Sequence, residues 1–176
     1  MNKLLVASLG VLAGSAVFLF RMRSARAGIG PIRGASPRPD QSTFIRPDLI
    51  PAAEAAARKH GVPVEGFVRQ IWQESRFNPQ AGSGAGAMGI AQFMAPTAAQ
   101  YGIDPWEPIQ ALDASAKMMK ALHNQFDSWA LASAAYNWGS GNVRKWQRAE
   151  RSPPKETRDY VALLAPLYGD HDPFVA

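Results

Sequence analysis

The apolar residues after Arg46 recur at helical spacing, and no stretch of the chain alternates β-branched and polar residues over the length of a strand. Prolines and glycines divide this pattern into segments. The predicted helices run from Pro47 to Gly61, begin again at Pro63 and after Pro96, and cover residues 109–126, 129–138, 140–150 and 155–168. The pattern predicts a mainly α domain over residues 46–170, followed by a short tail of residues 171–176.

One stretch interrupts the helices. Residues 76–96 are rich in glycine and contain only short apolar pieces. Glycine lets the backbone adopt positive φ and approach another group closely, so we expect a small hairpin or an irregular wall here. No Lys-Ser/Thr pair follows the glycines, and this excludes a phosphate-binding loop.

The start of the chain differs in composition from the rest. Residues 4–20 are 17 residues without a charge, and as a helix they would be about 26 Å long, near the lower limit for crossing a bilayer. We expect a hydrophobic helix that anchors the chain in a membrane, or alternatively a signal segment cleaved after Ala27. Three arginines before that site favour the anchor. Residues 21–45 contain glycine, proline and arginine without an apolar period, which predicts a flexible linker.

The positive charge is confined to the same region. The net charge is +5; residues 1–40 contain six basic residues against Asp40 alone, and residues 41–176 are neutral. The folded part is therefore not a basic nucleic-acid module, and the charge around residues 4–20 indicates a membrane surface. The chain has no cysteine, and its three histidines are scattered, so we expect no disulfide, no thiolate chemistry, no metal site and no cofactor.

Glu74 is the most notable charged residue of the predicted helices. It lies seven residues after Phe67 and three after Ile71, so it projects from the same helix face as these apolar side chains. A carboxyl group on an apolar face loses hydration, which raises its pKa and suits a general acid. The spacing alone equally fits a solvated glutamate at a helix end, or one paired with Arg76.

Four blocks of sequence favour the general acid over the structural interpretations of Glu74. They are Glu-Ser-Arg-Phe-Asn-Pro at residues 74–79, Gly-Ala-Met-Gly-Ile-Ala-Gln-Phe-Met at residues 86–94, Ala-Tyr-Asn-Trp-Gly at residues 135–139 and Glu-Thr-Arg-Asp-Tyr-Val at residues 156–161. In this order and spacing they resemble the soluble lytic transglycosylase (SLT) family, which cuts the glycan strands of peptidoglycan. The resemblance covers about residues 60–168 and implies a lysozyme-like fold. One departure is the proline at position 96, which the family commonly has one residue earlier.

The resemblance implies roles for individual residues. Glu74 matches the catalytic acid/base, and Tyr160 matches a tyrosine that donates a hydrogen bond to it, while Glu156 suits the first turn of the last helix as a structural residue. Contacts to the sugars are implied for Ser83, Met88, Gln92, Phe93, Tyr136, Asn137 and Tyr160. Three of these also have structural interpretations: Ser83 as a loop serine, Phe93 as core packing, and Tyr136 as a core aromatic whose hydroxyl has a partner.

No second carboxylate lies in the blocks at a position suited to a nucleophile, whereas most glycosidases need two. The resemblance implies a different route. Glu74 protonates the β-1,4 bond between N-acetylmuramic acid and N-acetylglucosamine, and then activates the muramyl 6-hydroxyl to form a 1,6-anhydro end. One alternative is a goose-type-lysozyme-like hydrolase that uses Asp104 or Asp113. Another is a glycan-binding assembly protein with little turnover.

The biological setting follows from the anchor and the substrate together. Peptidoglycan lies outside the cytoplasmic membrane, whereas positive charge after residues 4–20 favours a cytoplasmic location for the following chain. A phage or virion membrane protein avoids this conflict, because it is delivered and not translocated in the usual way. We therefore expect a membrane-anchored enzyme that acts in the periplasm or cell wall, or in a virion membrane, and that penetrates the wall locally for a phage or a secretion machine.

Overall fold

Helices make up most of residues 46–175, the part of the chain that the computed structural model describes. The helices and strands in chain order are η2 (Pro47–Leu49), α1 (Ile50–His60), α2 (Val64–Ser75), β1 (Ala87–Met88), β2 (Phe93–Met94), α3 (Ala95–Tyr101), α4 (Pro108–Phe126), α5 (Trp129–Trp138), α6 (Ser140–Gln147), α7 (Lys155–Leu164) and η3 (Ala165–Tyr168). The predicted anchor of residues 4–20 and linker of residues 21–45 lie outside the described residues. Among the helices from residue 46 onward, none combines the length and the apolar character needed to cross a bilayer.

Prolines explain where the first and last helices depart from their predicted bounds. Pro47 opens only a single 3-10 turn, and α1 begins at Ile50 with a proline of its own in the first turn. The helix predicted over residues 155–168 is divided at Leu164. Pro166 has no N–H to donate and its ring collides with the carbonyl group four residues earlier, so the chain continues as the 3-10 helix η3.

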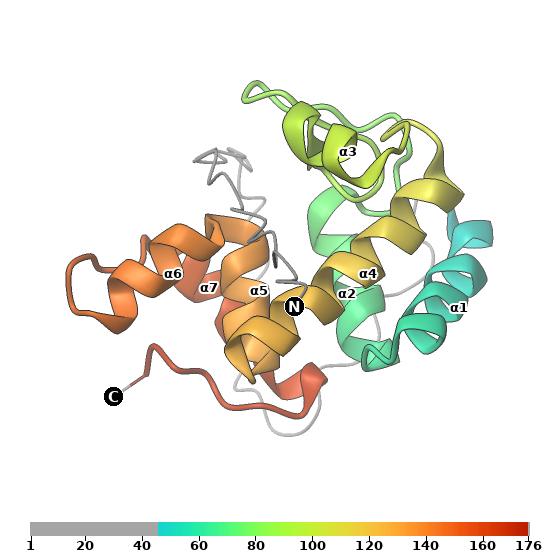
Figure 1. Ribbon diagram of the computed structural model, residues 1–176. Coiled ribbons are helices and arrows are strands. Elements are labelled where there is room, and N and C mark those ends of the chain that lie inside the picture. Colours follow the sequence, from blue (N-terminus) through green and yellow to red (C-terminus); the bar gives the residue numbers. More distant parts are fainter. Residues whose placement is uncertain (1–45, 176) are drawn as a thin grey trace, which may run out of the picture.

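Helix α5 lies at the centre of the domain and packs against α4, α6, α7 and η3 (Figure 1). Most of its buried side chains are alanines, and such small residues let several neighbours approach closely. Its N-terminus is capped twice: Ser128 Oγ accepts from the Leu131 N–H, and Asp170 Oδ2 accepts from the Ala130 N–H at 3.0 Å. Asp170 also accepts a hydrogen bond from Ser128. Asp170, which follows η3, thereby joins the C-terminal segment to the N-terminus of α5.

Helix α2 is held against η3 by a close contact that requires a glycine. A Cβ atom at Gly66 would lie 2.4 Å from the ring of Tyr168, a distance that no packed side chain tolerates. The hydroxyl of the same tyrosine donates a hydrogen bond to Gln70, which is fully buried one turn later in α2. These contacts hold the first two turns of α2 against η3.

The glycine-rich stretch contains a small hairpin, one of the two alternatives that the sequence left open. Strands β1 and β2 are antiparallel, with Ala87 opposite Met94 and Met88 opposite Phe93. A further bridge pairs Gly82 with Met88. Gly89 has a φ of 72°, and a Cβ atom there would lie 1.8 Å from the carbonyl oxygen of Pro105. The hairpin therefore packs against the connection between α3 and α4 through bare backbone, and α3, the hairpin and the start of α4 lie at one end of the molecule (Figure 1).

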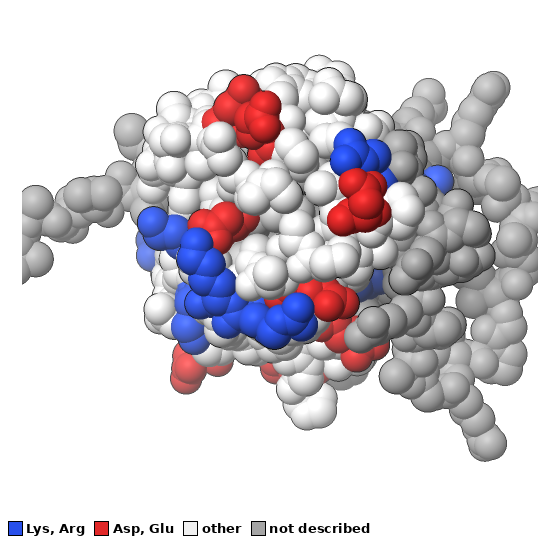
Figure 2. Space-filling view, turned by 90° about the vertical axis from the view of Figure 1, so that its right-hand side faces the viewer, with Lys and Arg blue, Asp and Glu red and all other residues white. Residues whose placement is uncertain are grey.

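The face that includes α1 and the start of α4 has a mixed surface. Acidic and basic side chains lie near one another on it, between larger neutral areas, and neither sign covers the visible surface (Figure 2). This distribution agrees with the neutral balance of residues 41–176.

Candidate active site

Glu74 lies in the last turn of α2, at the end of a face whose other members are buried. Phe67 and Ile71 on that face have no exposed surface, while Glu74 itself is partly exposed. Protein atoms nevertheless surround its carboxyl group, and this desolvation raises the pKa of Glu74 from its ordinary value of 4.5 to about 7. Glu74 is therefore accessible and close to half-protonated at neutral pH.

The chain turns sharply directly after this residue. Arg76 and Phe77 both adopt positive φ, of 55° and 60°, although neither is glycine. Phe77 is fully buried, so its packing offsets the cost of this backbone conformation. The guanidinium group of Arg76 lies over the ring of Trp72, 5.5 Å from its centroid. The ion pair between Arg76 and Glu74 that the sequence left open is absent from residues 46–175.

Tyr160 of helix α7 contacts the carboxyl group of Glu74 directly. Its hydroxyl donates a hydrogen bond of 2.6 Å to Glu74 Oε1, the contact that the family resemblance led us to expect. This bond favours the ionised carboxylate and lowers the pKa of Glu74, but desolvation outweighs it. The bond engages only one of the two carboxyl oxygens, Oε1.

Tyr136 of α5 supports the neighbouring backbone. Its hydroxyl donates to the carbonyl oxygen of Ala91 at 2.8 Å and lies 3.0 Å from the hydroxyl of Ser115 on α4. Burial raises the pKa of Tyr136, and the nearby charge of Glu74 adds to the rise. The hydroxyl thus has protein partners, as in the structural interpretation, and it ties the glycine-rich stretch to α4 and α5.

Asn137 follows Tyr136 and is held from the neighbouring helix. Its Oδ1 accepts a hydrogen bond of 2.8 Å from the hydroxyl of Thr157, which is buried in α7. The two amide protons of Asn137 have no hydrogen-bond partner among residues 46–175 and remain available to a ligand. Sequence reasoning missed Thr157, although it lies inside the last of the four blocks, because its partner is twenty residues away in the chain.

The residues of the glycine-rich stretch that are predicted to bind sugar also form hydrogen bonds within the loop. Gln92 has a φ of 51°, and its side-chain amide donates to the carbonyl oxygens of Ala81 and Gly89 at 3.1 and 2.8 Å. Its Oε1 is left as a free acceptor within the described residues. Ser83 Oγ accepts from the Ala87 N–H at 3.0 Å and keeps its own proton for another acceptor. Met88 is partly exposed on strand β1.

Phe93 differs from the other residues predicted to bind sugar. It is only 2% exposed and packs against Tyr101, with the ring centroids 6.1 Å apart. This supports the core-packing interpretation, in which Phe93 backs the hairpin instead of contacting a ligand. A short apolar run such as residues 93–94 does not show which of its side chains faces inward, because the direction depends on strand register.

A second carboxyl group affects Glu74. Glu156, in the first turn of α7, contributes a like charge that helps to raise the pKa of Glu74, and partial burial raises the pKa of Glu156 itself. Glu156 therefore has an electrostatic effect on Glu74 beyond the structural role that its place in the first turn of the helix indicates. The sequence contains a signal for this effect. Glu156 lies four residues before Tyr160 in the last block, and residues four apart lie on the same face of a helix.

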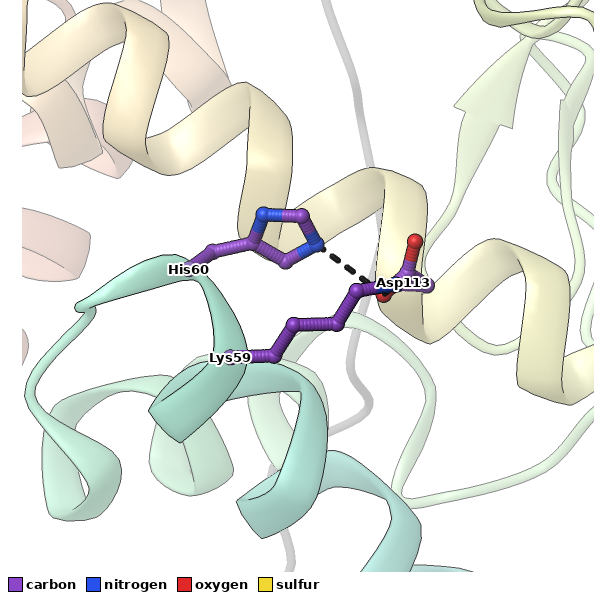
Figure 3. A network of polar contacts seen from close by, with 3 residues as sticks. All are labelled: Lys59, His60 and Asp113. Atoms are coloured by element: carbon purple, nitrogen blue, oxygen red, sulfur yellow. Dashed lines mark hydrogen bonds and ion pairs between the residues drawn. The ribbon is translucent and has the colours of Figure 1, made fainter.

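The two aspartates named for a hydrolase have other partners. Asp113 of α4 accepts hydrogen bonds from Lys59 and His60 of α1, at 2.7 and 2.9 Å (Figure 3). Burial alone would raise the pKa of Asp113, but these two partners lower it. Asp104 Oδ1 accepts from the backbone N–H of Trp106 and so stabilises a turn. Neither aspartate is among the groups that shift the pKa of Glu74.

The arrangement suits proton transfer in both directions. A carboxyl group with a pKa near the working pH can donate a proton and later take one back. The groups that shift the pKa of this carboxyl group come from α7, namely the hydroxyl of Tyr160 and the charge of Glu156. No group of three or more His, Asp or Glu side chains that could hold a metal ion occurs within residues 46–175.

Comparison with known protein families gives one match that spans most of the domain. Residues 51–158 match the family model described as "Transglycosylase SLT domain". The match contains Glu74, the glycine-rich stretch, Tyr136 and Asn137, and it ends two residues before Tyr160.

Several curated proteins are similar to this region. Membrane-bound lytic murein transglycosylase D of Escherichia coli (strain K12) is 34% identical over 129 residues, which are 62% of this chain and 28% of that protein. Peptidoglycan transglycosylase gp16 of Escherichia phage T7 is 35% identical over 99 residues, 51% of this chain and 8% of that protein. The transglycosylase of Enterobacteria phage PRD1 is 30% identical over 106 residues, 60% of this chain and 38% of that protein. This chain therefore matches a minor part of each relative.

Solved structures show the same fold. The lytic transglycosylase Slt of Pseudomonas aeruginosa aligns with a TM-score of 0.56 and 28% identity over 75% of this chain and 24% of that one. The 70 kDa soluble lytic transglycosylase of Escherichia coli aligns with a TM-score of 0.58 and 23% identity over 72% of this chain and 25% of that one.

Proposed function

The chain belongs to the transglycosylase SLT domain family, and on that premise we propose that it is a lytic transglycosylase of peptidoglycan. The bond cleaved is the β-1,4 linkage between N-acetylmuramic acid and N-acetylglucosamine, and the product carries a 1,6-anhydromuramyl end. The observation that carries this proposal is the partly exposed carboxyl group of Glu74, with its pKa of about 7 and its hydrogen bond from Tyr160.

In the first step Glu74 acts as the general acid. Its protonated carboxyl group gives its proton to the glycosidic oxygen, and the bond to C1 of the muramyl sugar breaks as the leaving sugar departs. Tyr160 holds Oε1, so proton transfer uses the other carboxyl oxygen. The positive charge that develops at C1 is stabilised by the substrate's own 2-acetamido group.

In the second step Glu74 acts as the general base. Its carboxylate takes the proton from the muramyl 6-hydroxyl, whose oxygen then forms the new bond to C1. This restores the protonated acid, and no water is consumed. A pKa close to 7 suits both steps, because the two protonation states are nearly balanced at neutral pH.

The remaining predicted residues bind and orient the strand in this proposal. The amide protons of Asn137 and the Oε1 of Gln92 have no protein partner within residues 46–175 and meet polar groups of the sugars. The Ser83 hydroxyl and the side chain of Met88 line the loop beside them. Tyr136 acts indirectly, because its hydroxyl fastens the backbone at Ala91.

The proposal is tested with the full chain and purified peptidoglycan, with soluble products identified by mass spectrometry. The wild type releases 1,6-anhydromuramyl ends, which are one water lighter than hydrolysed ends. Glu74→Gln lowers the rate of release by at least about a thousandfold, the decrease expected when general acid catalysis is lost. Glu65→Gln, an exposed glutamate on the first turn of the same helix, is the matched control and keeps the wild-type rate. Turnover by Glu74→Gln at the control rate would contradict the proposal.

Hydrolysis is the second candidate, and the like charge of Glu156 favours it. A like charge that couples to Glu74 is what a second carboxylate of a hydrolase would provide. Reducing ends among the products, lost in Glu156→Gln, would establish this reaction. Glycan binding without any release by the wild type would instead indicate an assembly protein.

The setting of the enzyme is a further part of the proposal. Residues 1–20 anchor the chain in a membrane, residues 21–45 are a linker, and the domain of residues 46–170 works on the cell wall. The names of a membrane-bound bacterial relative and of two phage relatives support this arrangement. We propose local penetration of the wall, by a phage or a secretion machine, as the purpose of such a tethered domain.

A further inference from the structure

Trp106 is a large apolar side chain that the fold leaves open to solvent. It is 38% exposed, and the other exposed large apolar residues within residues 46–175 are Ile109 and Val175. Trp106 and Ile109 lie three residues apart, at the connection between α3 and α4 and in the first turn of α4. The two exposed apolar residues thus lie close together in the chain, at the start of α4.

The turn that presents this ring is fixed by several contacts. Asp104 Oδ1 accepts from the Trp106 N–H at 2.9 Å, and the Glu107 N–H donates to the Asp104 carbonyl oxygen at 3.2 Å. The carbonyl oxygen of Pro105 lies so close to Gly89 that only glycine fits there. The backbone on both sides of Trp106 is therefore held in place, and little conformational freedom is lost when a ligand meets the ring.

The ring borders the loop that carries the predicted sugar contacts. A Cβ atom at Gly82 would lie 3.8 Å from Cη2 of Trp106, which is an ordinary contact distance. Gly82 immediately precedes Ser83, and it forms a bridge with Met88. Trp106 thus lies next to the segment that contains two residues of the proposed substrate site. The connection between α3 and α4, to which it belongs, is at the same end of the molecule as α3 (Figure 1).

The chemistry of an exposed indole fits a sugar. A pyranose ring has a face of C–H groups and a rim of hydroxyl groups, and tryptophan offers an apolar face and one N–H donor. The Nε1–H of Trp106 has no hydrogen-bond partner among the described residues. Mixed apolar and polar surfaces of this kind are suited to both parts of a sugar at once.

We propose that Trp106 is a substrate-binding residue that stacks on a sugar of the glycan strand beyond those held by Ser83. The inference rests on the proposed function, because it takes the strand that the enzyme cuts as the ligand. It adds to that function an extended site, in which the strand continues from Glu74 across the hairpin to the connection between α3 and α4. The enzyme would therefore prefer long strands to short fragments.

Binding is measured on the full chain carrying Glu74→Gln, so that bound strands are not cut. The probes are peptide-free glycan strands, either long or reduced to a single disaccharide, titrated calorimetrically. Adding Trp106→Ala is expected to weaken binding of the long strands about tenfold, the effect of losing one well-packed aromatic contact. Affinity for the disaccharide stays unchanged. Trp106→Phe keeps a ring and recovers most of the affinity, whereas a merely structural effect would weaken both probes alike.

Fluorescence provides an independent signal. Long strands shift the tryptophan emission of the parent protein, and the shift is lost in Trp106→Phe. Trp146→Phe is the matched control and keeps the shift. Trp146 lies on helix α6 and packs edge-on against Phe174, far along the chain from the hairpin.

The outcomes separate this inference from the proposed function. Long strands bound equally by Trp106→Ala and its parent would overturn the inference, even if the wild type releases anhydromuramyl ends. Selective loss of long-strand binding, with no release of glycan by the wild type, would keep the inference and overturn the proposed reaction. Unchanged strand binding together with weaker binding to lipid vesicles would assign the exposed ring to a membrane surface and also overturn the inference.

Discussion

Glu74 is held in the folded protein with a pKa of about 7, above its ordinary value of 4.5. A raised pKa means that the folded protein binds this proton more tightly than the unfolded chain does. The protonated group therefore adds to the free energy of unfolding. This contribution is fully present below pH 4.5 and is lost as the pH rises through 7. Ionisation of Glu74 costs stability at alkaline pH.

Glu74→Gln removes this cost and keeps an oxygen for the hydrogen bond from Tyr160. We expect the variant to exceed the wild type in free energy of unfolding at pH 8 by up to about 3 kcal/mol, on the order of 1.4 kcal/mol per pKa unit. At pH 5 the two proteins differ little. Urea unfolding at both pH values, with Glu65→Gln as the control, measures the difference. Equal stability of wild type and variant at pH 8 would show that Glu74 is not desolvated.

Tyr160 affects the same carboxyl group in the opposite direction. Its hydrogen bond favours the carboxylate, so Tyr160→Phe raises the pKa of Glu74 further. The rate of glycan release falls as the pH rises through the pKa of the acid, and we expect this alkaline limb to move to higher pH in Tyr160→Phe. A pH–rate profile of kcat measures the shift. A profile that falls in height without moving would mean that Tyr160 only positions the carboxyl group.

The site residues differ in how far the sequence predicted them. Helical spacing from Phe67 and Ile71 placed Glu74 on the buried face, and the family blocks indicated its contact with Tyr160. Thr157 was missed because its partner, Asn137, lies on another helix. Its pairing depends on how α5 and α7 pack, which no local pattern contains.

Helix α2 owes its place to Gly66, where a methyl group would collide with the ring of Tyr168. Gly66→Ala should push α2 away from η3 and lower the free energy of unfolding by about 2–3 kcal/mol, as overpacked cores do. Glycan release should fall as well, because Glu74 is at the end of the displaced helix. Chemical denaturation gives the first quantity and the release assay the second.

Gly84→Ala is the matched control, since no atom lies within 4 Å of a Cβ atom built there and its φ is not positive. Its stability should stay within a few tenths of a kcal/mol of the wild type. If Gly66→Ala were no less stable than this control, the close packing of α2 on η3 would be refuted.

The helices show which elements a local pattern is able to predict. Residues 129–138 were predicted as a buried helix that stops at Gly139, and α5 has these bounds. The hairpin was one of two alternatives, because strands of two residues are too short for a period to show. The division between α7 and η3 was missed although Pro166 was visible, since the amphipathic pattern continues across it.

At the scale of the whole molecule, the proposed anchor and the catalytic domain make separable contributions. A fragment of residues 46–176 should keep the secondary structure and thermal transition of the full chain, and it should release soluble glycan fragments. It should not sediment with lipid vesicles, whereas the full chain should. Circular dichroism and vesicle sedimentation measure the two properties. Sedimentation of the fragment to the same extent as the full chain would contradict an anchor at residues 4–20.

The sequence by itself determined the helical class, the position of Glu74 on an apolar face, and the four blocks that identify the family. These are local properties, because a helix repeats every 3.6 residues and a family block is contiguous. Only the tertiary structure decided that Arg76 lies over Trp72 instead of pairing with Glu74, that Phe93 is buried, and that Glu156 and Thr157 adjoin the site. Each of these depends on contacts between elements far apart in the chain, where packing chooses among partners that the local sequence leaves equally open.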